Sequence, residues 1–450
     1  MEPFYQLTKP GGAKLRDSLL LSYTGANLLK VFYSSLVSSH WLALIGSVNM
    51  VLITICTAFA SETLYISTTG SACQVIIDPT ASTNNDCSMQ LVMRPILAWI
   101  LGIVLFVIFA FTVVLILRLR GRVSGIFAEA TSIAGIATLY NGSLAQGFSQ
   151  SLRNSSNRYG LTTSEDETGM NSIVGLTPTP IQPPPYHQAS TSASKKKGHA
   201  SVHPAALAVF WVYLVGVLII ILYYRFVSKP GTGNGLETFM DSQSFGVRLF
   251  MTCIGLAIKF YWSSVEKYMR RIAPYTALTS SNGAAADQSV LIHSPSHPVT
   301  ALFHGDSWRL LLLGFVTVMA VLSEVLVITL TAVPFSAATA YLAFEISVYI
   351  CVGILGLMIV MIPAVLAWKV TKTGETPEPP ECIAEVFALL SDAVAWRFGA
   401  LGTLDGKERN QIIRSWQLRY SVRRMQVGEQ PNGSQSDWRI VVVDPTGAMP

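Results

Sequence analysis

Long uninterrupted runs of apolar residues alternate with polar segments along the whole chain. A hydrocarbon core about 30 Å thick needs roughly 20 apolar residues in a helix. Five runs reach this length easily. A sixth, weaker run carries Arg248 and Lys259 near its ends, where long cationic side chains can reach the interface. We therefore predict six spans, at residues 41–60, 95–117, 204–224, 245–262, 309–333 and 338–368.

Composition agrees with membrane residence, and charge placement predicts the orientation. The 450 residues are 51% hydrophobic and 13% charged, about half the roughly 25% charge of a soluble domain. Twenty-five Lys and Arg residues lie in four of the polar segments and three in the other two loops. Because cytoplasmic loops carry the excess of basic residues, both termini are predicted to be cytoplasmic. Spans above 20 residues favour a plasma, late secretory or vacuolar membrane. The four basic segments are 1–40, 118–203, 263–308 and 369–450, and the other two are 61–94 and 225–245.

These spans predict an all-α integral membrane protein whose helices form two repeat units. The polar stretch between the units is rich in Ser, Thr, Asn and Pro, a composition typical of a disordered linker. In the tail, apolar positions at i, i+3, i+4 and i+7 predict a helix from Ile383 to Leu390, and 420–427 with 438–443 predict a β-hairpin. The predicted divisions are a cytoplasmic arm 1–40, a first unit 41–140, a cytoplasmic linker 141–203, the third span with the second unit 204–394, and a cytoplasmic tail 395–450.

The arm and the loop before the fifth span are similar in sequence. Each carries a Pro-aromatic pair followed at matching intervals by Leu, Gly-Ala and Ser, and then by a Trp that opens a span. Repeated halves of this kind are common in membrane proteins. Because the second unit starts with the span 245–262, we expect this chain to lack an upstream helix that its relatives possess, either because the gene model is short or because the first unit has degenerated. The matched residues are Pro3 and Pro274, Leu7 and Leu278, Gly12 and Gly283, Ser18 and Ser289, and Trp41 and Trp308.

Both copies of this pattern resemble a known family. The residues Glu2-Pro3-Phe4-Tyr5-Gln6-Leu7 with Pro10-Gly11-Gly12-Ala13, and the segment from Lys267 to Tyr275 with Ser289, are similar to the fungal family called domain of unknown function 3433. The resemblance implies a multi-pass fungal membrane protein. It brings no catalytic residues and no assigned activity.

The sharpest linear motif is Pro183-Pro184-Pro185-Tyr186 in the linker. WW domains bind extended Pro-rich peptides in aromatic grooves, because polyproline II costs little entropy to hold. The Pro-Pro-x-Tyr pattern resembles the ligand of WW-domain ubiquitin ligases, and Lys195–Lys197 could accept ubiquitin or anchor the third span on anionic lipid. A Pro-rich spacer that contains these residues by composition is the alternative.

Two acidic residues lie within predicted spans. Glu324 and Glu345 lie at similar distances from the turn 334–338. Intramembrane acids are costly, and two at one depth could share a proton or hold a cation. The alternatives are that Glu345 reaches the headgroups and that Glu324 bonds to a neighbouring helix.

The remaining candidate chemistry is limited. Cys73 and Cys87 lie in the outside loop, where an oxidising compartment favours a disulfide between them and two free thiols are the alternative. The sequence has no phosphate-binding loop, nucleophile elbow or zinc-protease motif, so we expect neither an enzyme nor a cofactor. The basic residues follow the positive-inside rule, so their distribution does not indicate binding to nucleic acid. A scaffold or trafficking component that uses the linker motif is therefore the first hypothesis, and a transporter or channel that uses Glu324 is the alternative.

Overall fold

The computed structural model of the chain describes most of the helices and the polar segments that pack on them. The described residues are 2–9, 11–21, 28–69, 88–120, 122, 126, 132–139, 158–163, 171–175, 203–226, 235–240, 245–280, 282–292, 308–333, 341–372, 377, 379–426 and 436–443.

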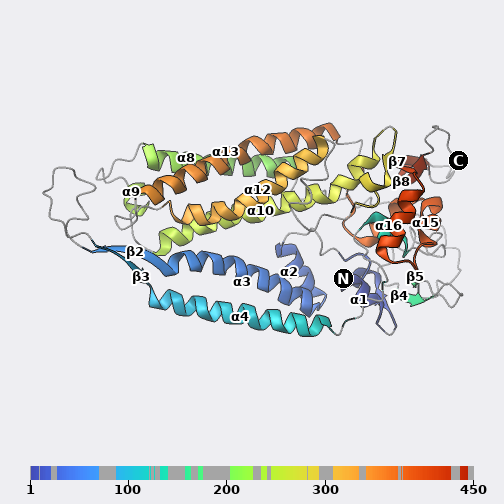
Figure 1. Cartoon of the computed structure of the whole chain (residues 1–450), viewed down its shortest axis with the longest axis horizontal. Coiled ribbons are helices and arrows are strands. Elements are labelled where there is room, and N and C mark those ends of the chain that lie inside the picture. Colours follow the sequence, from blue (N-terminus) through green and yellow to red (C-terminus); the bar gives the residue numbers. More distant parts are fainter. Residues whose placement is uncertain are drawn as a thin grey trace, which may run out of the picture.

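The described residues form six long helices. These helices lie roughly side by side, with a mixed helix and strand module at one end (Figure 1). The helix α12 contacts α10, α13 and α3, while α8 packs on α13 and α4 packs on α3. The helices α4, α8 and α13 are apolar nearly all round, which is typical of helices surrounded by lipid or by other helices. The six are α3 (Trp41–Thr63), α4 (Pro95–Arg120), α8 (Pro204–Phe226), α10 (Phe245–Leu278), α12 (Trp308–Thr331) and α13 (Tyr341–Lys372).

Four helices among the described residues are long and apolar enough to cross a membrane. They are α4, α8, and the segments Leu312–Thr331 of α12 and Phe344–Thr371 of α13. In α3 the apolar stretch Trp41–Cys56 is shorter than these. The chain is thus a largely helical membrane protein, as the apolar runs predicted.

The helix α10 is longer than the run that predicted it. It continues beyond the predicted end at Trp262 to Leu278, for 34 residues in all. At 1.5 Å per residue this is about 51 Å, well above the thickness of a bilayer core. The charged positions Glu266, Lys267 and Arg270 lie on the extension, which carries the chain from the helix bundle into the module (Figure 1).

The opposite end of the bundle is capped by smaller elements. The strands β2 (Leu64–Thr69) and β3 (Ser88–Met93) form an antiparallel hairpin between α3 and α4. Figure 1 places this hairpin and the short helix α9 (Gly235–Met240) at the end of the bundle away from the module. The helix α2 (Leu28–Val37) also packs on α3, but near the end of the bundle that meets the module (Figure 1). The chain therefore crosses between the two ends through the long helices.

The module contains two three-stranded sheets of the same design. In the first, β1 (Ala13–Lys14) pairs with β4 (Arg158–Thr163), which pairs with β5 (Asn171–Gly175). In the second, β6 (Ala284–Ala285) pairs with β7 (Arg419–Gln426), which pairs with β8 (Ser436–Val443). Each sheet thus joins a two-residue strand from one polar segment to a hairpin from another.

The first sheet corrects the predicted extent of the linker. The sequence predicts disorder over residues 141–203, but β4 and β5 lie inside this range, where β4 pairs with the arm and β5 pairs with β4. Tyr159 and Ile173 from these strands are 3% and 0% exposed. The hairpin is too short and too polar to stand out in the sequence, because only a few of its side chains reach the core.

The arm and the matching loop before α12 have corresponding backbone hydrogen bonds. The Gly12 N–H donates to the Lys9 carbonyl at 2.8 Å, and the Gly283 N–H donates to the Ser280 carbonyl at 3.0 Å. A 3₁₀ turn follows in each, Leu15–Asp17 and Ala286–Gln288. The sequence similarity between the arm and the later loop is therefore a similarity of backbone structure.

A turn glycine supports the second sheet, and its replacement provides a test. Gly283 has φ +67°, and a Cβ there would lie 3.1 Å from the Tyr420 carbonyl oxygen and 3.2 Å from the Arg419 Cβ. We expect Gly283→Ala to cost about 1–2 kcal/mol for the left-handed conformation alone, with the contact adding to it. Thermal unfolding of the detergent-purified chain measures the loss. Gly353→Ala, where nothing lies within 4 Å, is the control, and an equal loss there would contradict this assignment.

The module has one hydrophobic core to which both halves of the chain contribute. Phe4 and Leu19 from the first half and Tyr275 and Val290 from the second half are buried in one cluster. Short helices complete the module. They are α1 (Glu2–Leu7) at the start of the arm, α5 (Ile133–Ala137) after α4, and α14 (Ile383–Leu389), α15 (Asp392–Gly399) and α16 (Gly406–Ser415) after α13.

Candidate functional site

The centre of the module is a reciprocal contact between the two repeat units. The backbone N–H of Ala134 in α5 donates to the Val290 carbonyl of the second unit at 3.0 Å. The N–H of Ala384 in α14 donates to the Leu19 carbonyl of the first unit at 3.2 Å. Leu19 and Val290 are matched positions of the repeat, and Ile133-Ala134 matches Ile383-Ala384. Each unit thus docks its helix on the arm of the other unit.

The residues at this crossing are small and fully enclosed. Ala134 and Ala384 are both 0% exposed, as are Leu19 and Val290. A backbone hydrogen bond between two segments requires a close approach, which alanine permits and a larger residue would obstruct. The sequence signal for this contact is the repeated Ile-Ala pair, but the short helix around Ala134 carries too little pattern to predict where it docks.

Charged residues fasten the ends of the spans to the module. In the first unit Arg122, just after α4, pairs with Glu2 at 2.6 Å and lies over the Tyr5 ring at 3.8 Å from its centroid. In the second unit the Arg271 side chain is on α10, and the carboxylates of Glu381 and Glu385 act on it. Burial lowers the pKa of Arg271, and these carboxylates oppose that effect. The module is therefore held against both pairs of helices.

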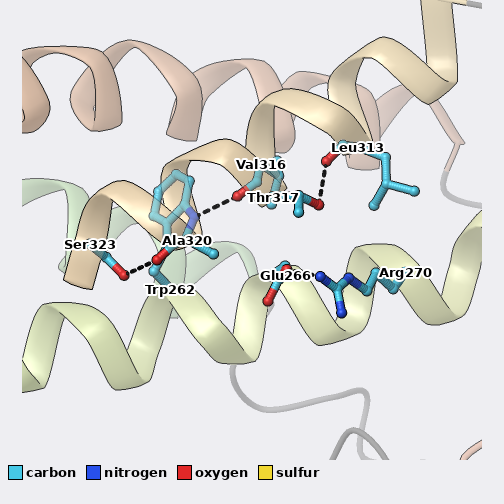
Figure 2. A network of polar contacts seen from close by, with 8 residues as sticks. All are labelled: Trp262, Glu266, Arg270, Leu313, Val316, Thr317, Ala320 and Ser323. Atoms are coloured by element: carbon cyan, nitrogen blue, oxygen red, sulfur yellow. Dashed lines mark hydrogen bonds and ion pairs between the residues drawn. The ribbon is translucent and has the colours of Figure 1, made fainter. Parts of the chain in front are cut away.

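Figure 2 shows polar contacts within α10 and within α12, and a contact from Trp262 that joins the two helices. The indole Nε1 of Trp262 donates to the Val316 carbonyl at 2.9 Å, and Trp262 is 0% exposed. One turn further along α10, Arg270 pairs with Glu266 at 2.5 Å. An indole N–H that is buried needs such a partner. The contact fixes how α10 is rotated against α12.

Glu324 has a basic partner inside the bundle. The Nζ of Lys259 on α10 lies 2.5 Å from a carboxylate oxygen of Glu324 on α12. The Lys259 side chain is 18% exposed and that of Glu324 is 56% exposed. Each charge thus has its countercharge beside it, which lowers the cost of placing either in an apolar span.

Glu345 has a different partner and a different depth. Its carboxylate pairs with Arg225, at the end of α8, at 2.5 Å. The Cys351 thiol bonds to the Thr329 hydroxyl at 3.1 Å, which fixes the register of the antiparallel helices α12 and α13. Counted from that contact, Glu324 and Glu345 are eleven residues apart in depth, or about 16 Å along the helices. The structure does not bring the two acids together.

The other predicted site residues lie outside the described part of the chain. These are the Pro-Pro-x-Tyr residues Pro183, Pro184, Pro185 and Tyr186, the basic cluster Lys195–Lys197, and the cysteines Cys73 and Cys87. The predicted docking motif and the predicted disulfide therefore stay predictions.

Cys382 at the start of α14 provides a reactivity test of the module. It is 9% exposed, and burial together with the nearby Glu385 carboxylate raises the pKa of its thiol to about 12. Since the thiolate is the reactive form, we expect Cys382 to resist maleimide labelling at neutral pH until the chain is unfolded. Ala388→Cys, at an exposed position of the same helix, is the control and should label rapidly. Equal labelling of both in the folded chain would contradict the buried site.

Comparison with known proteins gives one family. The family described as protein of unknown function (DUF3433) matches residues 1–65 and 245–335, about a third of the chain. No curated protein and no solved structure matches it. The first match runs from α1 to the end of α3, and the second runs from α10 to the end of α12. Two segments of the chain are thus similar to this family, one in each of the repeat units that meet in the module.

Proposed function

We propose that the protein is a six-span membrane scaffold whose module lies in the cytoplasm and whose linker recruits a WW-domain partner. The observation that carries the proposal is the reciprocal docking of the two units, because it gathers four separate polar segments into one body. Those segments are the four that hold 25 of the chain's Lys and Arg residues. Under the positive-inside rule, a body with that charge belongs on the cytoplasmic side.

The meeting of four polar segments in one module also supports six spans. The arm, the linker hairpin, the loop before α12 and the tail all contribute strands or turns to one module. Between each of these segments and the next, one helix must run away from the module and a second helix must run back to it. The pairs are α3 with α4, α8 with α10, and α12 with α13, so α3 and α10 also serve as spans in this proposal.

The short chain distance between the module and the Pro-Pro-x-Tyr motif supports the recruitment of a partner beside the module. Pro183 is eight residues after Gly175, the end of β5, so covalent geometry keeps it within about 28 Å of that strand. Tyr186 is eighteen residues before α8. A bound WW domain would therefore sit beside the module, and a ligase brought there would have Lys195–Lys197 within reach. The scaffold would be a trafficking or regulatory component rather than an enzyme.

The transporter alternative has no contact in its favour in the described part of the chain. Glu324 is paired with Lys259 and Glu345 with Arg225. Both acids therefore support helix packing in this proposal, and neither is assigned to an ion or a proton.

The proposal is tested by affinity purification of the full chain from native membranes. We expect Tyr186→Ala to remove a WW-domain ligase and the ubiquitin on Lys195–Lys197, because the tyrosine fills the second pocket of the WW groove. Pro178→Ala, a proline of the same linker outside the motif, should retain both. Mass spectrometry measures the bound proteins and the modified lysines. Equal recovery from both variants would remove the docking role.

A further inference from the structure

The helix α13 contains a proline in its interior. Pro363 lies nine residues before the end of the helix at Lys372. Proline has no backbone N–H, so the carbonyl four residues earlier, on Ile359, loses its helical hydrogen bond. A carbonyl without a donor is costly inside a membrane, and neighbouring helices commonly satisfy it. The helix α4, which is the second long helix of the first unit, has no proline after its first residue, Pro95. The gap in α13 therefore has no counterpart in α4.

The neighbouring helix α8 supplies the missing donor. The indole Nε1 of Trp211 donates to the Ile359 carbonyl at 3.1 Å. The same two helices are joined by the Arg225–Glu345 pair. Trp211 and Arg225 are fourteen residues apart on α8, and Ile359 and Glu345 are fourteen residues apart on α13. Both contacts thus belong to one antiparallel register, and this register brings an indole donor to the carbonyl that Pro363 leaves open.

Pro363 divides α13 into a part held by the bundle and a part held near the module. Before it, the Cys351 thiol bonds to the Thr329 hydroxyl on α12. After it, the Lys369 ammonium lies 5.6 Å from the centroid of the Tyr268 ring, on the extension of α10. The chain then continues to α14, which docks on the first unit in the module. A change of angle at Pro363 would therefore change the direction in which α13 enters the module.

We propose that Pro363 is a hinge in α13 and that Trp211 of α8 holds this hinge in the conformation described here. Helices bend most sharply at proline, where one backbone hydrogen bond is missing and the ring crowds the preceding turn. The indole replaces the missing bond from outside the helix. When α8 shifts and the indole leaves the carbonyl, the turns after Pro363 change direction. The contact thus couples the position of α8 to the direction in which α13 enters the module.

Spin-label distances along α13 in the full chain test the hinge. Labels at Ile350→Cys and Val370→Cys, which are exposed positions, lie on either side of Pro363, twenty residues and about 30 Å apart. The native cysteines are replaced by alanine, and the chain is placed in nanodiscs. We expect Trp211→Phe, which keeps a ring and loses the donor, to broaden the distance distribution by several ångströms.

Two controls distinguish the hinge from a general loosening of the bundle. Ile96→Cys and Ile116→Cys are also exposed and twenty residues apart, on α4, and their distance distribution should not change with Trp211→Phe. The indole of Trp262 donates to a carbonyl of α12 whose helical donor, the N–H of Ala320, is present. Trp262→Phe should therefore leave the distribution along α13 unchanged.

Pro363→Ala determines whether the indole acts through the missing bond. Alanine restores the N–H, so the Ile359 carbonyl receives its helical bond without Trp211. In that background Trp211→Phe should leave the distribution as narrow as in the unsubstituted chain. A narrow distribution for Trp211→Phe alone would mean that α13 does not bend at Pro363. A broadening that Pro363→Ala does not reverse would mean that Trp211 acts through packing, and either result overturns the proposal. Trp211→Leu, which also lacks the donor, repeats the measurement if Trp211→Phe does not fold.

Discussion

Ala134→Leu and Ala384→Leu are expected to destabilise the module by similar amounts. Both alanines are 0% exposed, and each donates a backbone hydrogen bond to the other unit. Extra methylene groups in a packed core typically cost about 1–3 kcal/mol, and separating the segments would also break a hydrogen bond worth about 1 kcal/mol. Resistance of the detergent-purified chain to trypsin, followed across a temperature series, measures the loss.

If the units dock reciprocally, Ala134 and Ala384 contribute equally to the module. The two variants should then lose their resistance to trypsin at similar temperatures. Ala388→Leu, on the exposed side of α14, should leave protection unchanged. A large effect of Ala384→Leu beside a negligible effect of Ala134→Leu would mean that only one of the two crossings supports the module.

Breaking the Lys259–Glu324 pair is expected to lower the stability of the helix bundle. Lys259→Met leaves the carboxylate, and Glu324→Leu leaves the ammonium, without its countercharge among apolar side chains. Removing one partner of a buried pair costs about 3 kcal/mol at the low end of the usual range, and the low end applies because Glu324 is half exposed. The aggregation temperature of the detergent-solubilised chain measures each loss.

The double variant distinguishes a loss caused by an unpaired charge from a loss caused by the absence of Lys259 or Glu324 itself. With both charges gone, the unpaired group is also gone, so Lys259→Met with Glu324→Leu should recover most of the loss. Asp287→Asn, which breaks the exposed Arg414–Asp287 pair of 2.6 Å in the module, should change stability by less than about 1 kcal/mol. A double variant as unstable as the worse single variant would contradict pairing as the role of these residues.

The long apolar runs predicted the bundle well, because burial in lipid leaves a strong and continuous signal. The helices α4 and α8 begin at the predicted residues and end two or three residues beyond the predicted ends. The tail hairpin also lies at the turn-rich segment that predicted it, with β7 and β8 paired on either side. In these elements local pattern and tertiary structure agree.

Long-range pairing could not be predicted from the same patterns. The strands β1 and β6 have two residues each, which is too short for any periodicity. Glu324 and Lys259 each stood out as a charge within a span, but their pairing depends on the register of α10 against α12. That register is set by Trp262 and Gly255, two residues that a single sequence does not distinguish from ordinary apolar positions.

Reciprocal docking is tested most directly by two engineered cysteine pairs in a chain that can be cut in the linker. A protease site after Ser192 separates the units, and the pairs are Ala134→Cys with Val290→Cys and Leu19→Cys with Ala384→Cys. Segments joined by a backbone hydrogen bond bring their Cα atoms into the range that a disulfide spans. We predict that each pair links the two fragments on a non-reducing gel after cutting, while the unmodified chain with its native cysteines gives separate fragments. Fragments that separate with both pairs, under conditions where Cys382 stays protected from maleimide, would contradict the reciprocal module.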